Sequence, residues 1–251
     1  MATSNRIGKN GRLGNQLFQL AAAYAQSLRV NEPCWIKGQH VGELLHLFPN
    51  VSKTVRLVKT DPASIYFGET KAHDLPPFQR SLNFEGYFQS ERYFENYTSE
   101  VKTLFACVDS FDPETIGLHV RLADYTQGYF AAFYHQLGPD YYERAIRAIE
   151  AKVGPKKLLV FSDDPTKARQ RLPQAKDIQS RLTFAPPASG PEHFKGMARC
   201  GHFITANSSF SWWSSYLCPN PDKVVVMPSL WVKDPRKTKV DDIYPKGVLI
   251  V

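Results

Sequence analysis

The stretch TIGLHV (115–120), followed by YYERAIRAIEAKV (141–153) and KLLVF (157–161), decides the fold. The first and last pieces are short apolar runs typical of buried strands, and the middle piece has the spacing of an amphipathic helix. Further along, GHFIT (201–205) and KVVVM (223–227) predict two more strands, and residues 211–217 predict a helix. Apolar strands separated by helices indicate a parallel sheet that is covered on both faces. The fold class is therefore α/β.

The first part of the chain gives weaker signals. The stretch LFQLAAAYAQSL (17–28) predicts a helix, because alanine and leucine favour one. Residues 55–58 and 64–67 read as short strands, and residues 91–105 as a second helical stretch. The polar segment DSFDPE (109–114) interrupts this pattern and predicts a linker. We therefore divide the chain into residues 1–112 and 113–251.

The composition of the 251 residues narrows the class of protein. A hydrophobic share of 43% with 22% charged residues is typical of a globular chain. The formal net charge of +7 favours an anionic partner such as a nucleotide diphosphate. The densest basic stretch, KDPRKTK (233–239), is interpreted as a solvated loop, with membrane or acceptor contact as the alternative. It is too short for a DNA-binding arm, so we expect no nucleic-acid partner.

The four cysteines and the apolar runs indicate where in the cell the protein is expected. No two cysteines form a CxxC pair, so we interpret all four as reduced core thiols. The chain shows no apolar leader at its start and no run near the ~20 residues that span a bilayer. We expect a cytoplasmic protein without a transmembrane anchor.

Polar motifs follow two predicted strands of the second half. In HVRLADY (119–125), the planar guanidinium of Arg121 suits a phosphate, and Asp124 is a candidate proton acceptor. The alternative is a structural Arg–Asp pair. In ITANSSFSWW (204–213), the side chains of Asn207, Ser208 and Ser209 stand between a strand and a helix and suit a diphosphate. At least one of the two tryptophans that follow is expected in the core.

A third motif, FSDDP (161–165), also ends a strand. Ser162, Asp163 and Asp164 suit hydrogen bonds to ribose or to a base. The acidic pair also suggests a metal, but no histidine or further acid lies nearby to complete an oxygen shell, so we expect none. The alternative is a cap for a helix that begins near Thr166.

Two motifs of the first half remain. GRLGNQ (11–16) precedes a helix, and its glycines would let backbone N–H groups approach an anion. Its alternative is a tight turn in which Asn15 caps the helix. NFEGYFQSERYF (83–94) mixes aromatic and polar groups that suit sugar rings, with an aromatic core strip as the alternative. The candidate contacts are Arg12, Gly14, Asn15 and Gln16 for the donor, and Glu85, Tyr87 and Gln89 for the acceptor.

Together, these segments resemble glycosyltransferase family 11, the α-1,2-fucosyltransferases of bacterial type. The similar segments are GRLGNQLFQLAAAYA (11–25), GYFQSERYF (86–94), HVRLADY, LGPDYYERAI (137–146), FSDDP, ITANSSFSWWSSYL (204–217) and NPDKVVVMPSLWV (220–232). They follow in the order of the family and cover most of residues 8–245.

The resemblance implies inverting transfer of L-fucose from GDP-fucose to the 2-hydroxyl of a galactose, without a metal or other cofactor. It implies a GT-B-like fold of two Rossmann-like halves with the donor in the cleft between them. The acceptor would lie with the first half and the nucleotide sugar with the second. Arg121 would grip the diphosphate, His119 would lie near phosphate or guanine, Asp163 or Asp164 would touch ribose or guanine, and Ser208 and Ser209 would bind phosphate. Asp124 is the candidate base, and Glu85 is the alternative.

The chain departs from the family pattern at one loop. The second arginine of H-x-R-R is Leu122, and the glycine after it is Ala123. One fewer positive charge predicts weaker donor binding or another nucleotide-deoxysugar donor, such as one carrying rhamnose. A non-catalytic glycan- or nucleotide-binding module is the remaining alternative.

Overall fold

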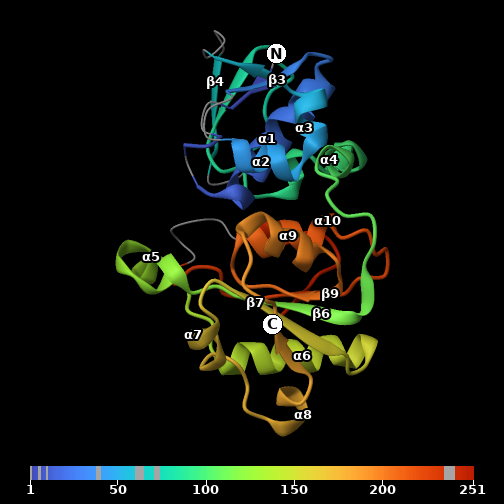
Figure 1. Cartoon of the computed structure of the whole chain (residues 1–251). Coiled ribbons are helices and arrows are strands. Elements are labelled where there is room, and N and C mark those ends of the chain that lie inside the picture. The colour runs from blue at the N-terminus through green and yellow to red at the C-terminus, as the bar shows by residue number, and fades with distance from the viewer. Residues whose placement is uncertain are drawn as a thin grey trace. The chain divides into compact units, whose positions relative to one another are not determined.

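The computed structural model describes residues 2–4, 7–9, 11–37, 41–59, 65–70, 74–234 and 241–251, apart from the side chains of Ala123, Asp124 and Asp241. The chain forms two compact units, residues 1–107 with 241–245 and residues 108–240 with 246–251. Each unit holds one parallel sheet with helices packed on it (Figure 1). The predicted α/β class, with two Rossmann-like halves of GT-B type, is confirmed. The division predicted from sequence was continuous, whereas residues 241–245 belong to the first unit.

The first unit contains a five-stranded parallel sheet in the order β3-β2-β1-β5-β4. Its strands are β1 (Ala2–Thr3), β2 (Cys34–Lys37), β3 (Arg56–Val58), β4 (Ile65–Gly68) and β5 (Leu82–Glu85). Its helices are α1 (Leu13–Arg29), α2 (Gly42–Leu47), α3 (Pro49–Thr54) and α4 (Thr98–Leu104), with short 3₁₀ turns η1 (Glu91–Tyr93), η2 (Glu95–Tyr97) and η5 (Asp241–Ile243).

Helix α1 begins earlier than predicted. It starts at Leu13 instead of Leu17, with Arg12 as its N-cap residue. Asn15 therefore lies inside the first turn, and the alternative that it caps the helix is wrong. Its side-chain oxygen instead accepts a hydrogen bond from the amide of Gln89, which follows β5.

The second unit contains a six-stranded parallel sheet in the order β11-β10-β9-β6-β7-β8. Its strands are β6 (Asp112–Val120), β7 (Lys157–Ser162), β8 (Leu182–Phe184), β9 (Cys200–Ile204), β10 (Val225–Met227) and β11 (Leu249–Ile250). Its helices are α5 (Gly128–Phe133), α6 (Pro139–Val153), α7 (Pro165–Arg169), α8 (Lys176–Gln179), α9 (Gly190–Ala198) and α10 (Ser209–Leu217), with a 3₁₀ turn η3 (Ala123–Thr126).

The predicted linker at residues 109–114 is wrong in its second half. Strand β6 already begins at Asp112, whose backbone N–H donates to the carbonyl of Arg199 at 2.7 Å. Asp112 also pairs with Cys200 in the sheet. Pairing with β9 thus draws polar residues into the strand in spite of their low strand propensity.

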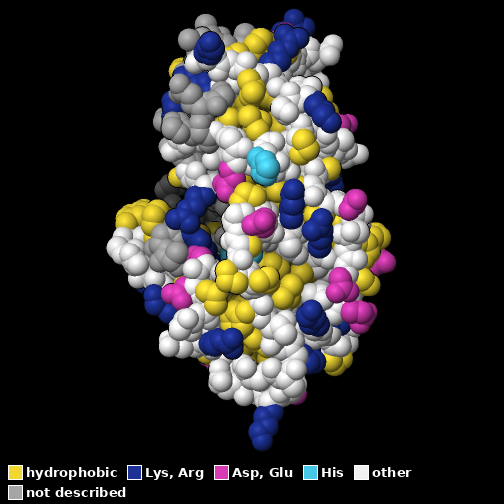
Figure 2. Space-filling view, in the orientation of Figure 1, with side chains coloured by type: hydrophobic (Ala, Val, Ile, Leu, Met, Phe, Trp, Pro, Cys, Tyr) yellow, Lys and Arg dark blue, Asp and Glu magenta, His cyan; other side chains and the backbone are white. Residues whose placement is uncertain are grey.

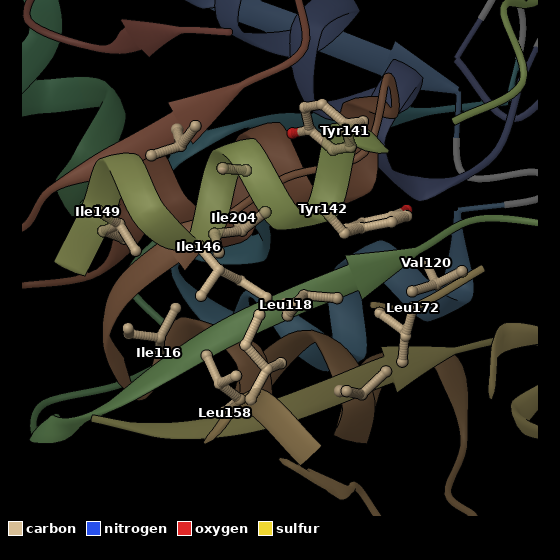
Figure 3. Close-up of a cluster of buried hydrophobic side chains, with 14 of the residues drawn as sticks. Ile116, Leu118, Val120, Tyr141, Tyr142, Ile146, Ile149, Leu158, Leu172 and Ile204 are labelled. Atoms are coloured by element: carbon tan, nitrogen blue, oxygen red, sulfur yellow. The ribbon is translucent and has the colours of Figure 1, made fainter. Parts of the chain in front are cut away.

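Helix α6 covers one face of the second sheet (Figure 3). Its Tyr142, Ile146 and Ile149 are buried in one cluster with Ile116 and Leu118 of β6. Since successive strand residues alternate between the two faces of a sheet, His119 points to the face opposite α6. Helices α9 and α10 cover that opposite face (Figure 1).

Both tryptophans of α10, Trp212 and Trp213, are fully buried and pack edge to face at 4.9 Å, so the expected core role holds for each. All four cysteines are free thiols, of which Cys107 alone is partly exposed. Among the described residues, no helix is long and apolar enough to cross a membrane.

Candidate active site

The second sheet reverses its strand order beside β6. Strand β6 lies between β7 and β9, so the chain leaves the sheet at three adjacent carboxyl ends. Ligands of open α/β sheets bind at such a switch point. The residues that follow these strands are Arg121 after β6, Asp163 after β7 and Asn207 after β9. The structure therefore gathers three of the predicted motifs at one edge.

Arg121 is held in place by the neighbouring strand. Its guanidinium forms an ion pair with Asp163, and the other oxygen of Asp163 accepts the N–H of Leu122 at 2.9 Å. The Arg121 side chain is 14% exposed. A guanidinium carries five donors, so it has enough for both a carboxylate and a phosphate oxygen. Asp163 uses both oxygens to fix the loop that carries Arg121, and its predicted contact with ribose or guanine stays a prediction.

The other two residues of FSDDP are engaged locally. Asp164 is the N-cap of α7 and accepts from the N–H of Lys167 at 3.0 Å, which lowers its pKa together with the Lys167 ammonium. The Ser162 hydroxyl accepts from the N–H of Asp164 at 3.1 Å. The structure therefore contains the alternative arrangement, in which this motif caps a helix. The predicted donor contacts of Ser162 and Asp164 stay predictions.

His119 is a buried, neutral imidazole beside Arg121. Burial first, and then the charges of Arg121 and His193, lower its pKa to about 3. Its ring lies 5.5 Å from that of Phe210 in α10, and its Nδ1 has no hydrogen-bond partner among the described residues. The positive charge of this edge therefore comes from Arg121 and not from the histidine.

The N-terminus of α10 faces the same edge. Ser208 is its N-cap, whose hydroxyl accepts the N–H of Phe210 at 3.4 Å, and Ser209 is its first residue. The first turn contains no acidic side chain. Backbone N–H groups and the helix dipole make such an end suitable for an anion. The predicted phosphate contacts Ser208 and Ser209 thus lie at a helix end that can bind one.

Asn207 has a structural role. The residue is 2% exposed, and its side-chain amide donates to the carbonyls of His135 at 2.9 Å and Trp231 at 2.7 Å. This amide ties the loop before α10 to two other segments. The structure therefore gives Asn207 an anchoring role, and its predicted contact with the donor stays a prediction.

Tyr125 is a site residue that the sequence interpretation missed. The Arg121 guanidinium lies 5.3 Å from its ring centroid, and its hydroxyl donates to the carbonyl of Asn207 at 3.2 Å. Its ring stacks on Tyr134 at 3.9 Å and 4°. Tyr125 thus joins the Arg121 loop to the loop before α10. It closes the HVRLADY motif, which was the only sequence signal for it.

Leu122 replaces the second arginine of the family pattern, and its side chain is buried. It is 3% exposed and belongs to the apolar cluster under α6. Strand alternation turns it away from Arg121 and His119. The side chain of Asp124, the candidate base, lies outside the described residues.

A second cluster forms in the first unit, where β1 lies beside β5 at the reversal of that sheet. The amide of Gln89 donates to the side-chain oxygen of Asn15 at 2.7 Å, and the amide of Gln19 donates to the carbonyl of Gly86 at 3.0 Å. A predicted donor contact, Asn15, is thus bonded to a predicted acceptor contact, Gln89. The two sequence motifs of the first half therefore lie together in one hydrogen-bonded cluster.

Backbone geometry shapes both sides of that cluster. Gly11 has a φ of +82°, and a Cβ there would lie 2.2 Å from the Asn15 amide nitrogen. Opposite it, Phe88 has a φ of +54° and is fully buried. Tyr87, beside it, is 44% exposed, and its N–H donates to the Glu69 carboxylate at 2.7 Å. Two of the remaining predicted contacts, Gly14 and Gln16, are buried in the first turn of α1. Arg12 precedes this turn and is exposed. Glu85 is partly exposed at the end of β5.

Among the described residues, no group of three or more His, Cys, Asp or Glu side chains is placed to hold a metal ion. The basic stretch at 233–239 falls largely outside the description, from residue 235 onward.

Comparisons with known proteins identify the family of the chain. The chain is 35% identical over 127 residues to the Escherichia coli O-antigen biosynthesis glycosyltransferase WbnK, a match that covers 50% of this chain and 42% of WbnK. It is 23% identical to an Escherichia coli alpha-1,2-colitosyltransferase, with 96% of each chain covered. The crystal structure of NodZ alpha-1,6-fucosyltransferase soaked with GDP-fucose has the same fold, with a TM-score of 0.50 at 15% identity over 87% of this chain and 91% of that one. The model of glycosyl transferase family 11 matches residues 80–249. Since that match covers more than half of the chain, the protein belongs to glycosyl transferase family 11.

Proposed function

We propose that this glycosyltransferase moves L-fucose from GDP-fucose to the 2-hydroxyl of a galactose, with inversion and without a metal. The observation that carries the proposal is Arg121, held by Asp163 at the switch point of the second sheet and close to the N-terminus of α10. A fixed guanidinium beside a helix N-terminus supports binding of a diphosphate.

Departure of the nucleotide is the demanding step, because negative charge develops on its phosphate while the sugar becomes oxocarbenium-like. In our proposal, Arg121, the hydroxyls of Ser208 and Ser209 and the N–H groups of α10 stabilise that charge. His119 is neutral and can contribute only a hydrogen bond. Removing one preorganised donor of this kind costs about 10²–10³ in rate.

The acceptor proton needs a destination during inversion. Asp124 is the proposed base because it follows Arg121 in the same loop. Glu85 is the alternative, at the end of β5 in the acceptor-side cluster. Tyr87 and Gln89 complete the proposed contacts to galactose, and the Gly11–Asn15 turn completes those to the donor. A rate of Asp124→Asn that equals wild type across the pH range would exclude Asp124 as the base.

A second candidate is transfer of a different deoxysugar. One relative is named a colitosyltransferase, and this chain carries Leu122 where the family pattern has an arginine. The absence of that charge near the donor favours testing other nucleotide sugars, including the GDP esters of colitose and rhamnose.

We place the reaction in the cytoplasm, in agreement with four free thiols.

The test is a donor panel. Purified protein with EDTA is incubated with GDP-fucose and other GDP-, dTDP- and UDP-deoxysugars, with and without a β-galactoside, and product mass and released nucleotide are measured. We expect acceptor-dependent GDP release from GDP-fucose. Turnover of another donor alone would assign the second candidate, and donor binding without any turnover would indicate a binding module.

Variants of Arg121 connect the activity to the site. We expect Arg121→Ala to lose at least 10² in kcat while staying folded, and Arg121→Lys to recover only part of the loss, because an ammonium lacks the planar fork. A folded Arg121→Ala enzyme with wild-type kcat would contradict the role of this residue.

A further inference from the structure

Helix α5 is an apolar helix without a buried residue. None of its six residues, Gly128–Phe133, is buried. Tyr129 is 73% exposed and Phe130 43% exposed. Apolar side chains gather at the left edge of the molecular surface in Figure 2, where Figure 1 places α5. Residues 128–134 (GYFAAFY) contain no charged side chain. Burial of apolar surface therefore does not explain why this segment is aromatic.

The exposed rings form an ordered group. Tyr129 and Phe133, four residues apart, stack at 5.9 Å with 13° between their planes. Phe130 lies edge to face with Tyr129 at 5.7 Å. Residues three and four apart share one side of a helix, so these three rings form a continuous aromatic surface. We call Tyr129, Phe130 and Phe133 the aromatic platform.

The platform is fixed at its C-terminal end. The carbonyl of Phe133 accepts the N–H of Lys233 at 2.9 Å, and Tyr134 forms a β-bridge with Val232. A six-residue helix is not stable by itself. These bonds to another segment supply the order that the helix lacks, so the rings are presented on a supported backbone.

The residues next to the platform also contact residues of the candidate active site. The Tyr134 ring stacks on Tyr125, whose ring lies under the Arg121 guanidinium. The amide of Asn207 binds the carbonyl of His135, two residues beyond the platform. One layer of side chains therefore connects the platform to both the guanidinium and the N-terminus of α10.

We infer that the aromatic platform binds the acceptor glycan, through the sugar rings that precede the galactose to be modified. This inference rests on the proposed function, because it requires a glycan acceptor. Pyranose rings present apolar C–H faces that pack on aromatic rings, and their hydroxyls can reach the Tyr129 hydroxyl. An uncharged platform fits a neutral sugar. Residues 128–134 contain no lysine or arginine that would attract an anionic lipid surface, and the neighbouring Lys233 contacts them through its backbone N–H. Vesicle binding is therefore one arm of the test.

The test compares acceptors of different length. With a simple β-galactoside and with an oligosaccharide that ends in the same galactose, KM and kcat are measured for wild type, Tyr129→Ala and Phe130→Ala. We expect KM for the oligosaccharide to rise about tenfold, which corresponds to about 1.4 kcal/mol, with little change for the simple galactoside or for the donor. Tyr129→Phe should keep most of the affinity. Tyr66→Ala, which removes another exposed ring in strand β4 of the first unit, is the matched control.

The outcomes separate the platform from the proposed function. Normal turnover with an unchanged oligosaccharide KM in both alanine variants overturns the platform. The platform is also overturned if these variants lose binding to phosphatidylserine vesicles while KM stays constant, since the rings then contact lipid. If wild type transfers no sugar, the proposed function fails, and calorimetric titration of the oligosaccharide into wild type and Tyr129→Ala decides the platform: equal or absent binding overturns it.

Discussion

Arg121 depends on Asp163 for its orientation. The carboxylate holds the guanidinium with one oxygen and the backbone of the Arg121 loop with the other. The proposed diphosphate-binding charge and its support thus follow adjacent strands, which is the arrangement that a preorganised site requires.

We expect Asp163→Asn to lower kcat about tenfold and to raise the donor KM, because the amide retains an acceptor for Leu122 but loses the charge that orients Arg121. The double variant with Arg121→Ala should be no slower than Arg121→Ala alone, since both changes act through one group. Asp164→Asn is the control. It keeps an oxygen that can cap α7 but loses the charge that pairs with Lys167, so it should lower stability slightly while leaving kcat unchanged. Additive losses in the double variant would mean that Asp163 contacts the substrate itself.

His119 makes stability depend on pH. Its pKa is about 3 in the folded protein and near 6.5 in the unfolded chain. As the pH falls below 6.5, the unfolded chain binds a proton that the folded state does not bind. The free energy of unfolding therefore decreases toward acid, by up to about 1.4 kcal/mol per pH unit.

Urea unfolding of His119→Phe between pH 7 and 5 tests this effect. The variant has no titrating nitrogen beside Phe210, so its stability should depend less steeply on pH than that of wild type. His46→Phe, at an exposed histidine, is the control and should keep the wild-type slope. Equal slopes for wild type and His119→Phe would show that this imidazole does not resist protonation.

At the scale of elements, the turn before α1 joins two segments of the first unit. A Cβ at Gly11 would displace Asn15, which is bonded to Gln89. We expect Gly11→Ala to lower both stability and transfer rate. Gly247→Ala is a matched control, because Gly247 has nearly the same φ, +83°, and no atom within 4 Å of the added Cβ. Equal losses in unfolding free energy for the two variants would assign the whole effect to backbone strain.

The elements differ in how well the sequence predicts them. Strands β6, β7 and β9 were predicted because they are apolar runs buried on both faces. Strands β1 and β2 were missed because they have two and four residues, too few for a pattern. Strand β5 was interpreted as a sugar-binding or aromatic core segment, since its alternation merges with the turn after it.

The site was predictable to a similar extent. The motif residues at strand ends gather as expected, because adjacent parallel strands must end at one edge. Their hydrogen-bond partners were not predictable: Asp163, Asp164 and Asn207 bond to the protein itself, through contacts made by residues distant in sequence. The burial of Leu122 depends on the register of β6, which a one-residue change would invert.

At the scale of the whole molecule, residues 246–251 complete the second sheet. Strand β11 pairs with β10, and the N–H of Val251 donates to the carbonyl of Met227 at 3.1 Å. Leu249 and Val251 pack against the core cluster of that unit. We expect removal of these six residues to lower the stability of the second unit by about 2 kcal/mol.

Tryptophan fluorescence can follow the second unit alone. Trp35 is in the first unit, whereas Trp212, Trp213 and Trp231 are in the second, so the deletion is made in a Trp35→Phe background. Ile250→Ala, at a half-exposed side chain, is the control and should change stability little. An unchanged urea midpoint after deletion would show that β11 is dispensable.

The return of residues 241–245 to the first unit also affects how the chain is made. When only residues 1–240 have left the ribosome, each of the two units still lacks a piece. The first lacks Asp242, which pairs with Arg92 at 2.9 Å, and the second lacks β11. Neither unit can complete its folding until residues 241–251 have also left the ribosome. Until then, apolar surface beside β10 stays uncovered, and the nascent chain is a substrate for chaperones that bind such surfaces.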